Sequence, residues 1–267
     1  MLKTEMRNPD TMHINEMSTT DMMRVMQAAN KRAAESLDTE LDNIGAAVDG
    51  ISERMKKGGR LFYIGCGTSG RLGVLDASEC PPTFGVSYDT VQGIIAGGNE
   101  RMFRAGENAE DKYENGCEDI KSYGVSAGDV VVGISAAGNA AYVVGAIETA
   151  KALGCVTVGL TSNPDTAILN AADIKIFTDT GAEVLTGSTR LKAGTAQKIV
   201  LNAITTCAMT KTGKVYENMM INLAPSNEKL KRRVIRIVTE ILHCTEDEAV
   251  ARLEANEWNI RRAVDKN

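Results

Sequence analysis

Short apolar runs rich in valine or isoleucine recur along the middle of this 267-residue chain, separated by segments long enough to form helices. Short buried strands that alternate with helices are typical of a parallel sheet with both faces covered. The sequence therefore predicts an α/β fold with a doubly wound, five-stranded parallel sheet flanked by helices. The expected strands are 61–65, 91–96, 130–135, 156–161 and 174–178.

Helical patterns flank this region on both sides. Ser18 and Asp21 form a capping box that opens one helix, and apolar residues at three- and four-residue spacing over 37–55 indicate a second. A basic amphipathic helix over 227–243 and two short helices follow the sheet, and they resemble a module of the ubiquitin-associated type. We expect its basic side chains to form a solvated face. The predicted domains are an N-terminal helical segment (1–57), the α/β domain (58–222) and a C-terminal helical module (223–267).

A glycine-rich loop follows the first expected strand. Residues 65–71 read Gly-Cys-Gly-Thr-Ser-Gly-Arg, and a helical segment comes next. Glycine lets the backbone approach an anion, and a helix N-terminus offers free N–H groups and a positive dipole. Thr68 and Ser69 add two hydroxyl donors. The loop therefore predicts an anion cradle.

The same loop spells G-x-G-x-x-G, the pattern of a dinucleotide site, which expects an acidic residue at the end of the second strand. Here that strand ends in Gly-Gly-Asn at 97–99. The helix after the loop is expected to end near Glu79, with Pro81 and Pro82 making the crossover long and irregular. The loop fits a terminal phosphate better than NAD or FAD, because a terminal phosphate has more oxygens to satisfy.

Composition argues against nucleic acid, membrane and metal as partners of this chain. A net charge of −5 argues against a nucleic-acid surface, and the chain has no apolar run long enough to cross a membrane. Six cysteines without C-x-x-C spacing and two distant histidines indicate reduced thiols and no metal site. We expect a cytoplasmic protein without cofactor or metal.

Hydroxyl side chains recur where the expected strands end. They are Ser135, Thr161, Ser162, Thr178 and Thr180. Ligands of open α/β sheets bind beyond the carboxyl ends of the strands, so these hydroxyls suit a polyol or a phosphate. The alternative is that they only cap the helices that follow.

Two glutamates stand out by position, Glu79 after the cradle helix and Glu110 after the second strand, although most glutamates are simply surface charges. Residues 65–85 read GCGTSGRLGVLDASECPPTFG and residues 183–198 read EVLTGSTRLKAGTAQK. Through these blocks, and over nearly its whole length, the chain resembles the N-acetylmuramic acid 6-phosphate etherases, a family with the sugar isomerase (SIS) fold.

The resemblance implies a lyase that cleaves the ether between sugar C3 and D-lactate and yields N-acetylglucosamine 6-phosphate, a step of cell-wall amino sugar recycling. A base removes the C2 proton of the ring-opened sugar, an acid protonates the leaving lactate, and water then adds at C3. This chemistry needs two proton carriers. The resemblance assigns lactate protonation and water activation to Glu79 and C2 deprotonation to Glu110.

The residues expected to bind the substrate phosphate are Gly67, Thr68, Ser69, Gly70, Ser135, Gly138, Asn139, Ser188 and Thr189. One loop departs from the family pattern. Where the family reads Ser-Gly-Arg-Thr-Pro, residues 137–141 read Ala-Gly-Asn-Ala-Ala. Each lost hydrogen bond weakens binding by about 1 kcal/mol. We expect the activity class to be kept with weaker phosphate binding.

The sequence leaves two alternative functions open. One is a non-catalytic SIS-fold sugar-phosphate sensor, which the altered loop would fit but which could dispense with Glu79 and Glu110. The other is an aldose–ketose isomerase, against which the sequence around Glu79 argues. A homodimer is expected, because a single such domain leaves apolar helix surface uncovered.

Overall fold

The computed structural model describes residues 1–106, 108–222, 225 and 227–264. The strands are β1 (Leu61–Gly65), β2 (Val91–Ile95), β3 (Val130–Ile134), β4 (Val156–Thr161), β5 (Ile174–Phe177), β6 (Val215–Tyr216) and β7 (Met219–Met220). The α-helices are α1 (Thr19–Glu35), α2 (Leu41–Lys56), α3 (Gly67–Phe84), α4 (Tyr113–Ser122), α5 (Ala141–Ala152), α6 (Ala167–Ala171), α7 (Lys192–Lys211), α8 (Glu228–Leu242), α9 (Glu246–Ala255) and α10 (Ile260–Val264). The short 3-10 helices are η1 (Lys3–Glu5), η2 (Pro9–Thr11), η3 (Ile14–Glu16) and η4 (Asn99–Met102).

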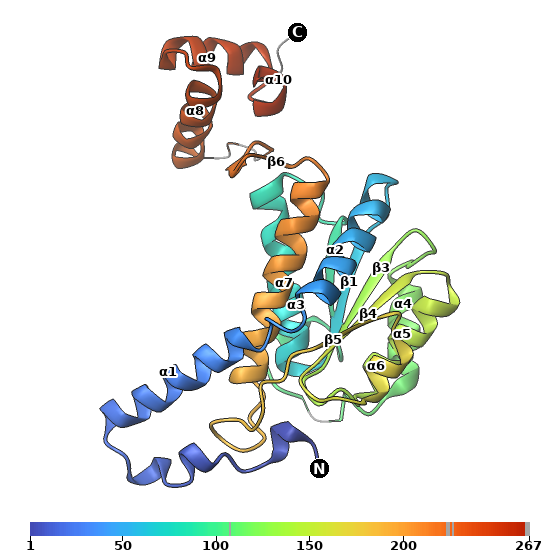
Figure 1. Cartoon of the computed structure of the whole chain (residues 1–267). Helices are drawn as coiled ribbons and strands as arrows, with labels where there is room; N and C mark the ends of the chain where they lie inside the picture. Colours follow the sequence, from blue (N-terminus) through green and yellow to red (C-terminus); the bar gives the residue numbers. More distant parts are fainter. Residues whose placement is uncertain (107, 223–224, 226, 265–267) are drawn as a thin grey trace.

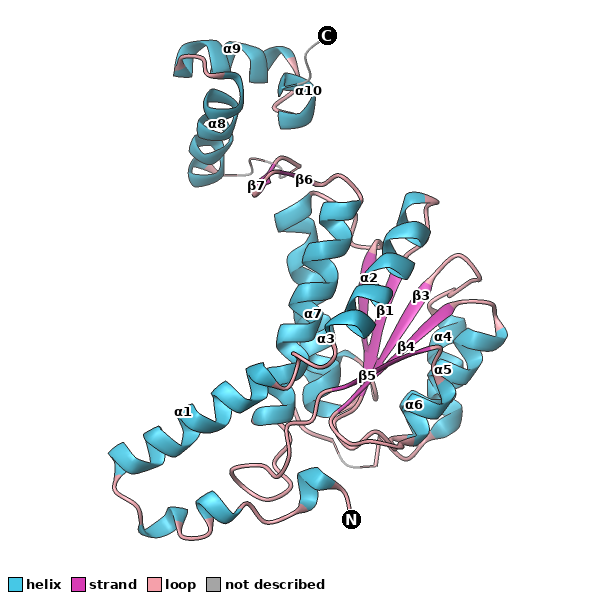
Figure 2. Ribbon diagram, viewed as in Figure 1, coloured by secondary structure: helices cyan, strands magenta, loops and turns pink. Residues whose placement is uncertain are grey.

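The central sheet is parallel and has five strands in the order β2-β1-β3-β4-β5 (Figure 2). This confirms the predicted fold class. The chain passes from β1 outward to β2 and then returns to the other side of β1 with β3. The winding direction therefore reverses between β1 and β3, and crevices for ligands form at such a reversal.

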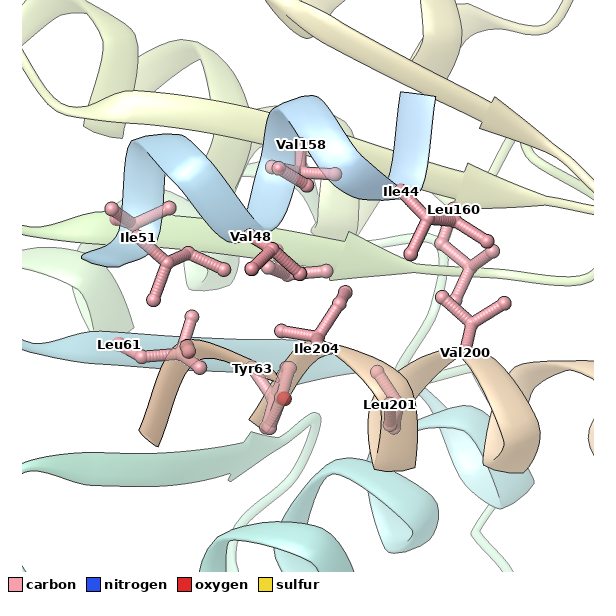
Figure 3. Close-up of a cluster of buried hydrophobic side chains, with 14 of the residues drawn as sticks. Ile44, Val48, Ile51, Leu61, Tyr63, Val158, Leu160, Val200, Leu201 and Ile204 are labelled. Atoms are coloured by element: carbon pink, nitrogen blue, oxygen red, sulfur yellow. The ribbon is translucent and has the colours of Figure 1, made fainter. Parts of the chain in front are cut away.

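Alternate side chains of the strands build two separate cores. Leu61 and Tyr63 of β1 face the core formed with α2, α3 and α7, whereas Phe62 and Ile64 face the core formed with α4, α5 and α6. Figure 3 shows the first core, where α2 and α7 pack over β1 and β4. Strand side chains alternate between the faces of a sheet, so each apolar run serves both cores.

Helix α3 differs from the prediction. It does not end near Glu79 but continues through Pro81 and Pro82 to Phe84, so the expected irregular crossover was wrong. Cys80 and Phe84 lie one turn apart and are both buried, and this burial holds the last turn against the sheet. Gly85, with φ of 61°, donates its N–H to the Pro81 carbonyl and closes the helix.

The N-terminal residues pack against the α/β domain, the chain then leaves the domain, and α1 runs back to it and contacts α7 (Figure 1). Thr4 is fully buried, and its hydroxyl accepts a hydrogen bond from the Asn163 side chain at 3.0 Å. The Thr11 hydroxyl donates to the Val184 carbonyl at 2.9 Å. The Ser18 hydroxyl accepts from the amide of Asp21 at the start of α1, which is one half of the predicted capping box. The Asp21 carboxylate accepts from the Ser18 hydroxyl at 2.6 Å rather than from the Ser18 amide.

The C-terminal helices α8, α9 and α10 pack around a core of their own, beyond the end of α7 (Figure 1). The short β6–β7 hairpin precedes them, and sequence periodicity did not reveal it because each strand has only two residues. Thr245 and Glu248 form the predicted capping box at the start of α9.

A buried carboxylate fixes the start of α7. Both oxygens of the fully buried Glu183 accept hydrogen bonds at 2.9 Å, from the amides of Lys192 and Ala193. Burial lowers the pKa of the Lys192 ammonium, while the negative charge of Glu183 opposes this shift. Glu183 therefore satisfies two helix N–H groups and balances a buried cation.

Replacing Glu183 with glutamine is expected to destabilise the fold by about 3 kcal/mol, since one strong charged hydrogen bond and the counter-charge of Lys192 are lost. Urea unfolding measures this effect. The matched control is Glu53→Gln on the exposed face of α2. Equal midpoints for the two variants would contradict the assigned role of Glu183.

Candidate active site

A cavity of about 490 Å³ opens at the carboxyl ends of β1 and β3, where the winding of the sheet reverses. Its walls come from the start of α3, the segment after β3, the segment between β2 and α4, and the turn before α7. Of the residues predicted to form the site, it is lined by Gly67, Thr68, Ser69, Glu110, Ser135 and Thr189.

The first wall is the predicted anion cradle. Gly67 has a φ of 53° and opens α3, whose first N–H groups are therefore directed to the cavity. The Ser69 hydroxyl donates to the Gln197 side chain at 3.0 Å and so ties the cradle to α7. Thr68 also lines the cavity. A helix of this length with free N–H groups favours an anionic group at this end.

Gly70 is not among the cavity-lining residues and has a packing role. A Cβ at Gly70 would lie 2.5 Å from the carbonyl oxygen of Gly65. Only glycine lets α3 approach the end of β1 this closely. Gly70 therefore sets the position of the cradle.

The altered loop after β3 forms the opposite wall. Ser135 and Ala137 line the cavity, and the Ser135 hydroxyl accepts a hydrogen bond from the Gly138 amide at 3.1 Å. Gly138 has a φ of 80° and packs against Thr166. The Asn139 side chain accepts from the Ala167 amide at 3.0 Å, at the start of α6. Gly138 and Asn139 thus shape the loop without lining the cavity.

The turn before α7 supplies a third contact surface. Thr189 lines the cavity, whereas the neighbouring Ser188 does not. The Thr189 carbonyl accepts from the Gly194 amide at 2.9 Å, in the first turn of α7. Glu183 anchors the same turn of the helix and so holds Thr189 in place.

Acidic side chains face the cradle from the β2–α4 segment. Glu110 and Asp111 line the cavity, and the backbone carbonyl of Glu110 accepts from the Tyr142 amide at 3.0 Å. Burial, with the negative charges of Glu110 and Asp111 as further causes, raises the pKa of the Cys66 thiol to about 12. The negative charges of Glu110 and Asp111 therefore act on the part of the cavity that Cys66 lines.

Glu79 lies elsewhere in the protomer. It is exposed on α3, twelve positions after Gly67, which is about 18 Å along the helix axis, and it does not line the cavity. Burial raises the pKa of nearby Asp76, and the charge of Glu79 adds to this shift. One protomer thus does not bring Glu79 and Glu110 into the same cavity.

Most of the hydroxyls expected at the rim form hydrogen bonds within the protein. The Thr161 hydroxyl donates to the Asn163 carbonyl at 2.8 Å, and the hydroxyls of Ser162 and Thr178 lie 3.1 Å apart. Thr180 lines a separate hollow beside the N-terminal segment. Apart from Ser135, these hydroxyls do not line the main cavity, and in the described chain none of them caps a helix.

Two arginines that the sequence reasoning missed also line the cavity, Arg71 and Arg101. Arg71 ends the glycine-rich block, so the cradle pattern could have indicated it. Arg101 belongs to η4, and its sequence surroundings gave no signal.

Within the described ranges, no group of three or more histidine, cysteine or acidic side chains is placed to hold a metal ion. None of the helices described is long and apolar enough to cross a membrane.

Comparison with known proteins gives two family matches. Residues 43–151 match the glucokinase regulatory protein N-terminal SIS domain, and residues 121–207 match the SIS domain. Among solved structures, phosphoheptose isomerases of Francisella tularensis and Neisseria gonorrhoeae superpose with TM-scores of 0.53 and 0.51. Each is 16% identical to this chain, and they cover 74% and 72% of it and all of their own chains. They show the fold alone.

Curated relatives are much more similar in sequence. An N-acetylmuramic acid 6-phosphate etherase of Symbiobacterium thermophilum is 50% identical over 98% of this chain and 87% of its own length. The enzyme of the same name from Clostridium beijerinckii is 48% identical over 98% of this chain and 86% of its own length.

Proposed function

The chain belongs to the N-acetylmuramic acid 6-phosphate etherases, and we propose how its cavity performs their reaction. It is a carbon–oxygen lyase that acts on N-acetylmuramic acid 6-phosphate. The observation that carries this assignment is the near-half identity over almost the full length of both chains. The cavity at the reversal of the sheet, with a phosphate cradle and carboxylates, fits the same assignment.

The substrate phosphate binds at the start of α3, where N–H groups and the Thr68 and Ser69 hydroxyls meet the cavity. Thr189 and Ser135 face this position from two other walls. Because Ala137 offers no hydroxyl, the α3 end contributes the larger part of phosphate recognition. The sugar then extends from the cradle toward Glu110.

Glu110 acts as the base that removes the proton at C2 of the ring-opened sugar. The electron pair of the C2–H bond is first held as the enolate of the C1 aldehyde. It then forms the C2–C3 double bond as the C3–oxygen bond breaks, and the lactate oxygen takes a proton from the general acid. Water then adds to C3 of the unsaturated aldehyde, and C2 regains a proton. These steps are proton transfers, which positioned carboxyl groups catalyse.

The general acid is Glu79, contributed by a second copy of the chain in a homodimer. Glu79 cannot reach the cavity of its own protomer, but it is exposed on α3 beside Leu75, which is 42% exposed. Met23 on the extended helix α1 is 63% exposed. An outward-facing acid beside an exposed leucine, with a further exposed apolar residue on α1, suits an interface that brings the acid to a neighbouring site.

The proposed place of action is the cytoplasm. The six cysteines are all free, which fits a reducing compartment.

Incubation of the purified protein with N-acetylmuramic acid 6-phosphate tests the activity. We expect D-lactate and N-acetylglucosamine 6-phosphate in equal amounts. Absence of lactate at millimolar substrate, together with thermal stabilisation by sugar phosphates, would instead show a sugar-phosphate sensor. Interconversion of aldose and ketose phosphates would show an isomerase.

A further inference from the structure

The cavity must meet two separate anions of its substrate, a phosphate on C6 and the lactyl carboxylate attached through the oxygen on C3. The start of α3 suits the phosphate. Of the other walls, the one formed by the β2–α4 segment carries Glu110 and Asp111, whose negative charges repel a carboxylate. A cation is therefore needed on that side to hold the lactyl group.

Arg71 and Arg101 are the cationic side chains that line the cavity in the described part of the chain. The Arg71 Nε donates to the Met102 carbonyl at 3.0 Å, so this side chain supports the end of η4. Arg101 lies within η4, on the same β2–α4 segment that carries Glu110.

The fold holds the Arg101 guanidinium in a defined place. A Cβ at Gly106 would lie 2.4 Å from Arg101 Cζ, and one at Gly97 would lie 3.1 Å from Arg101 Cγ. Two glycines thus leave room for this side chain. Its one described hydrogen bond, from Nη1 to the Ala105 carbonyl, is long at 3.4 Å. A guanidinium has five N–H donors, and among the described residues only this one bond uses any of them.

We propose that Arg101 binds the lactyl carboxylate of the substrate and that Arg71 positions η4 for this contact, an inference that rests on the proposed function. C2 and C3 are adjacent atoms, so a sugar with its C2 proton at Glu110 has its lactyl group on the β2–α4 side. Arg101 belongs to that side and can form a two-point contact with a carboxylate. It thereby selects substrates that carry an acid on the C3 oxygen.

The test compares two ligands that share the phosphate. N-Acetylmuramic acid 6-phosphate carries the lactyl group, and N-acetylglucosamine 6-phosphate lacks it and serves as a competitive inhibitor. In Arg101→Gln we expect KM for the first to rise about 10- to 100-fold, while the inhibition constant of the second changes less than about threefold. The matched control is Arg104→Gln, an exposed arginine of the same segment outside the cavity lining.

Three outcomes would overturn the inference. Equal weakening of both ligands would assign Arg101 to the phosphate, and unchanged KM would leave it no role in binding. An equal rise in KM in Arg104→Gln would show that the loss of positive charge, and not a direct contact of Arg101 with the carboxylate, weakens binding. Failure of the wild type to release lactate would count against the proposed function itself, whereas a normal wild type with an unaffected Arg101→Gln counts only against this inference.

Discussion

Glu110→Gln is expected to lower kcat for lactate release by about 10²- to 10⁴-fold, the usual contribution of a general base. Glutamine keeps the size of the side chain but cannot accept the C2 proton. The fold should be unaffected, since the hydrogen bond that anchors Glu110 uses its backbone carbonyl. Exchange of the C2 hydrogen with deuterated water should disappear together with lactate release.

The control for this variant is Glu114→Gln, an exposed glutamate in the first turn of α4 that does not line the cavity. It should keep wild-type turnover. Persistent C2 exchange in Glu110→Gln would show that another group is the base, with Asp111 the nearest candidate on the same wall.

Glu79→Gln is expected to lower lactate release by a comparable factor while C2 exchange with solvent continues. The base is still present in this variant, so the proton can leave and return. Loss of the acid blocks only departure of the lactate oxygen and the later activation of water. Nuclear magnetic resonance in deuterated water measures both events in one sample.

Ser78→Ala serves as the control for Glu79→Gln, because Ser78 is the neighbouring exposed residue of α3. The Ser78 hydroxyl donates only to the Leu75 carbonyl, within the helix. If Glu79→Gln lost C2 exchange as well as lactate release, the division of roles between the two glutamates would be wrong.

The sheet could be predicted from sequence because its strands are short apolar runs, and the three central ones, β1, β3 and β4, are buried on both faces. The end of α3 could not. Local propensity places a break at Pro81, but burial of Cys80 and Phe84 outweighs it. Packing against residues distant in the sequence therefore sets where α3 ends, and such contacts cannot be deduced from local sequence.

The cavity was foreseen only in part. The cradle follows from a local pattern of glycines and hydroxyls, so Thr68 and Ser69 were found. Arg101 was missed, because its place in the cavity depends on how η4 folds back over Gly97 and Gly106. Family resemblance identified Glu79 as a proton carrier, yet its distance from the cavity is a property of the folded helix.

Mixing the two inactive variants tests the shared site most directly. After subunit exchange between equal amounts of Glu79→Gln and Glu110→Gln, half of the dimers are mixed, and each mixed dimer has one site with both glutamates intact. The account predicts recovery of about a quarter of wild-type lactate release. Activity no higher than that of either variant alone, in a sample shown to contain mixed dimers, would contradict a site built from two chains.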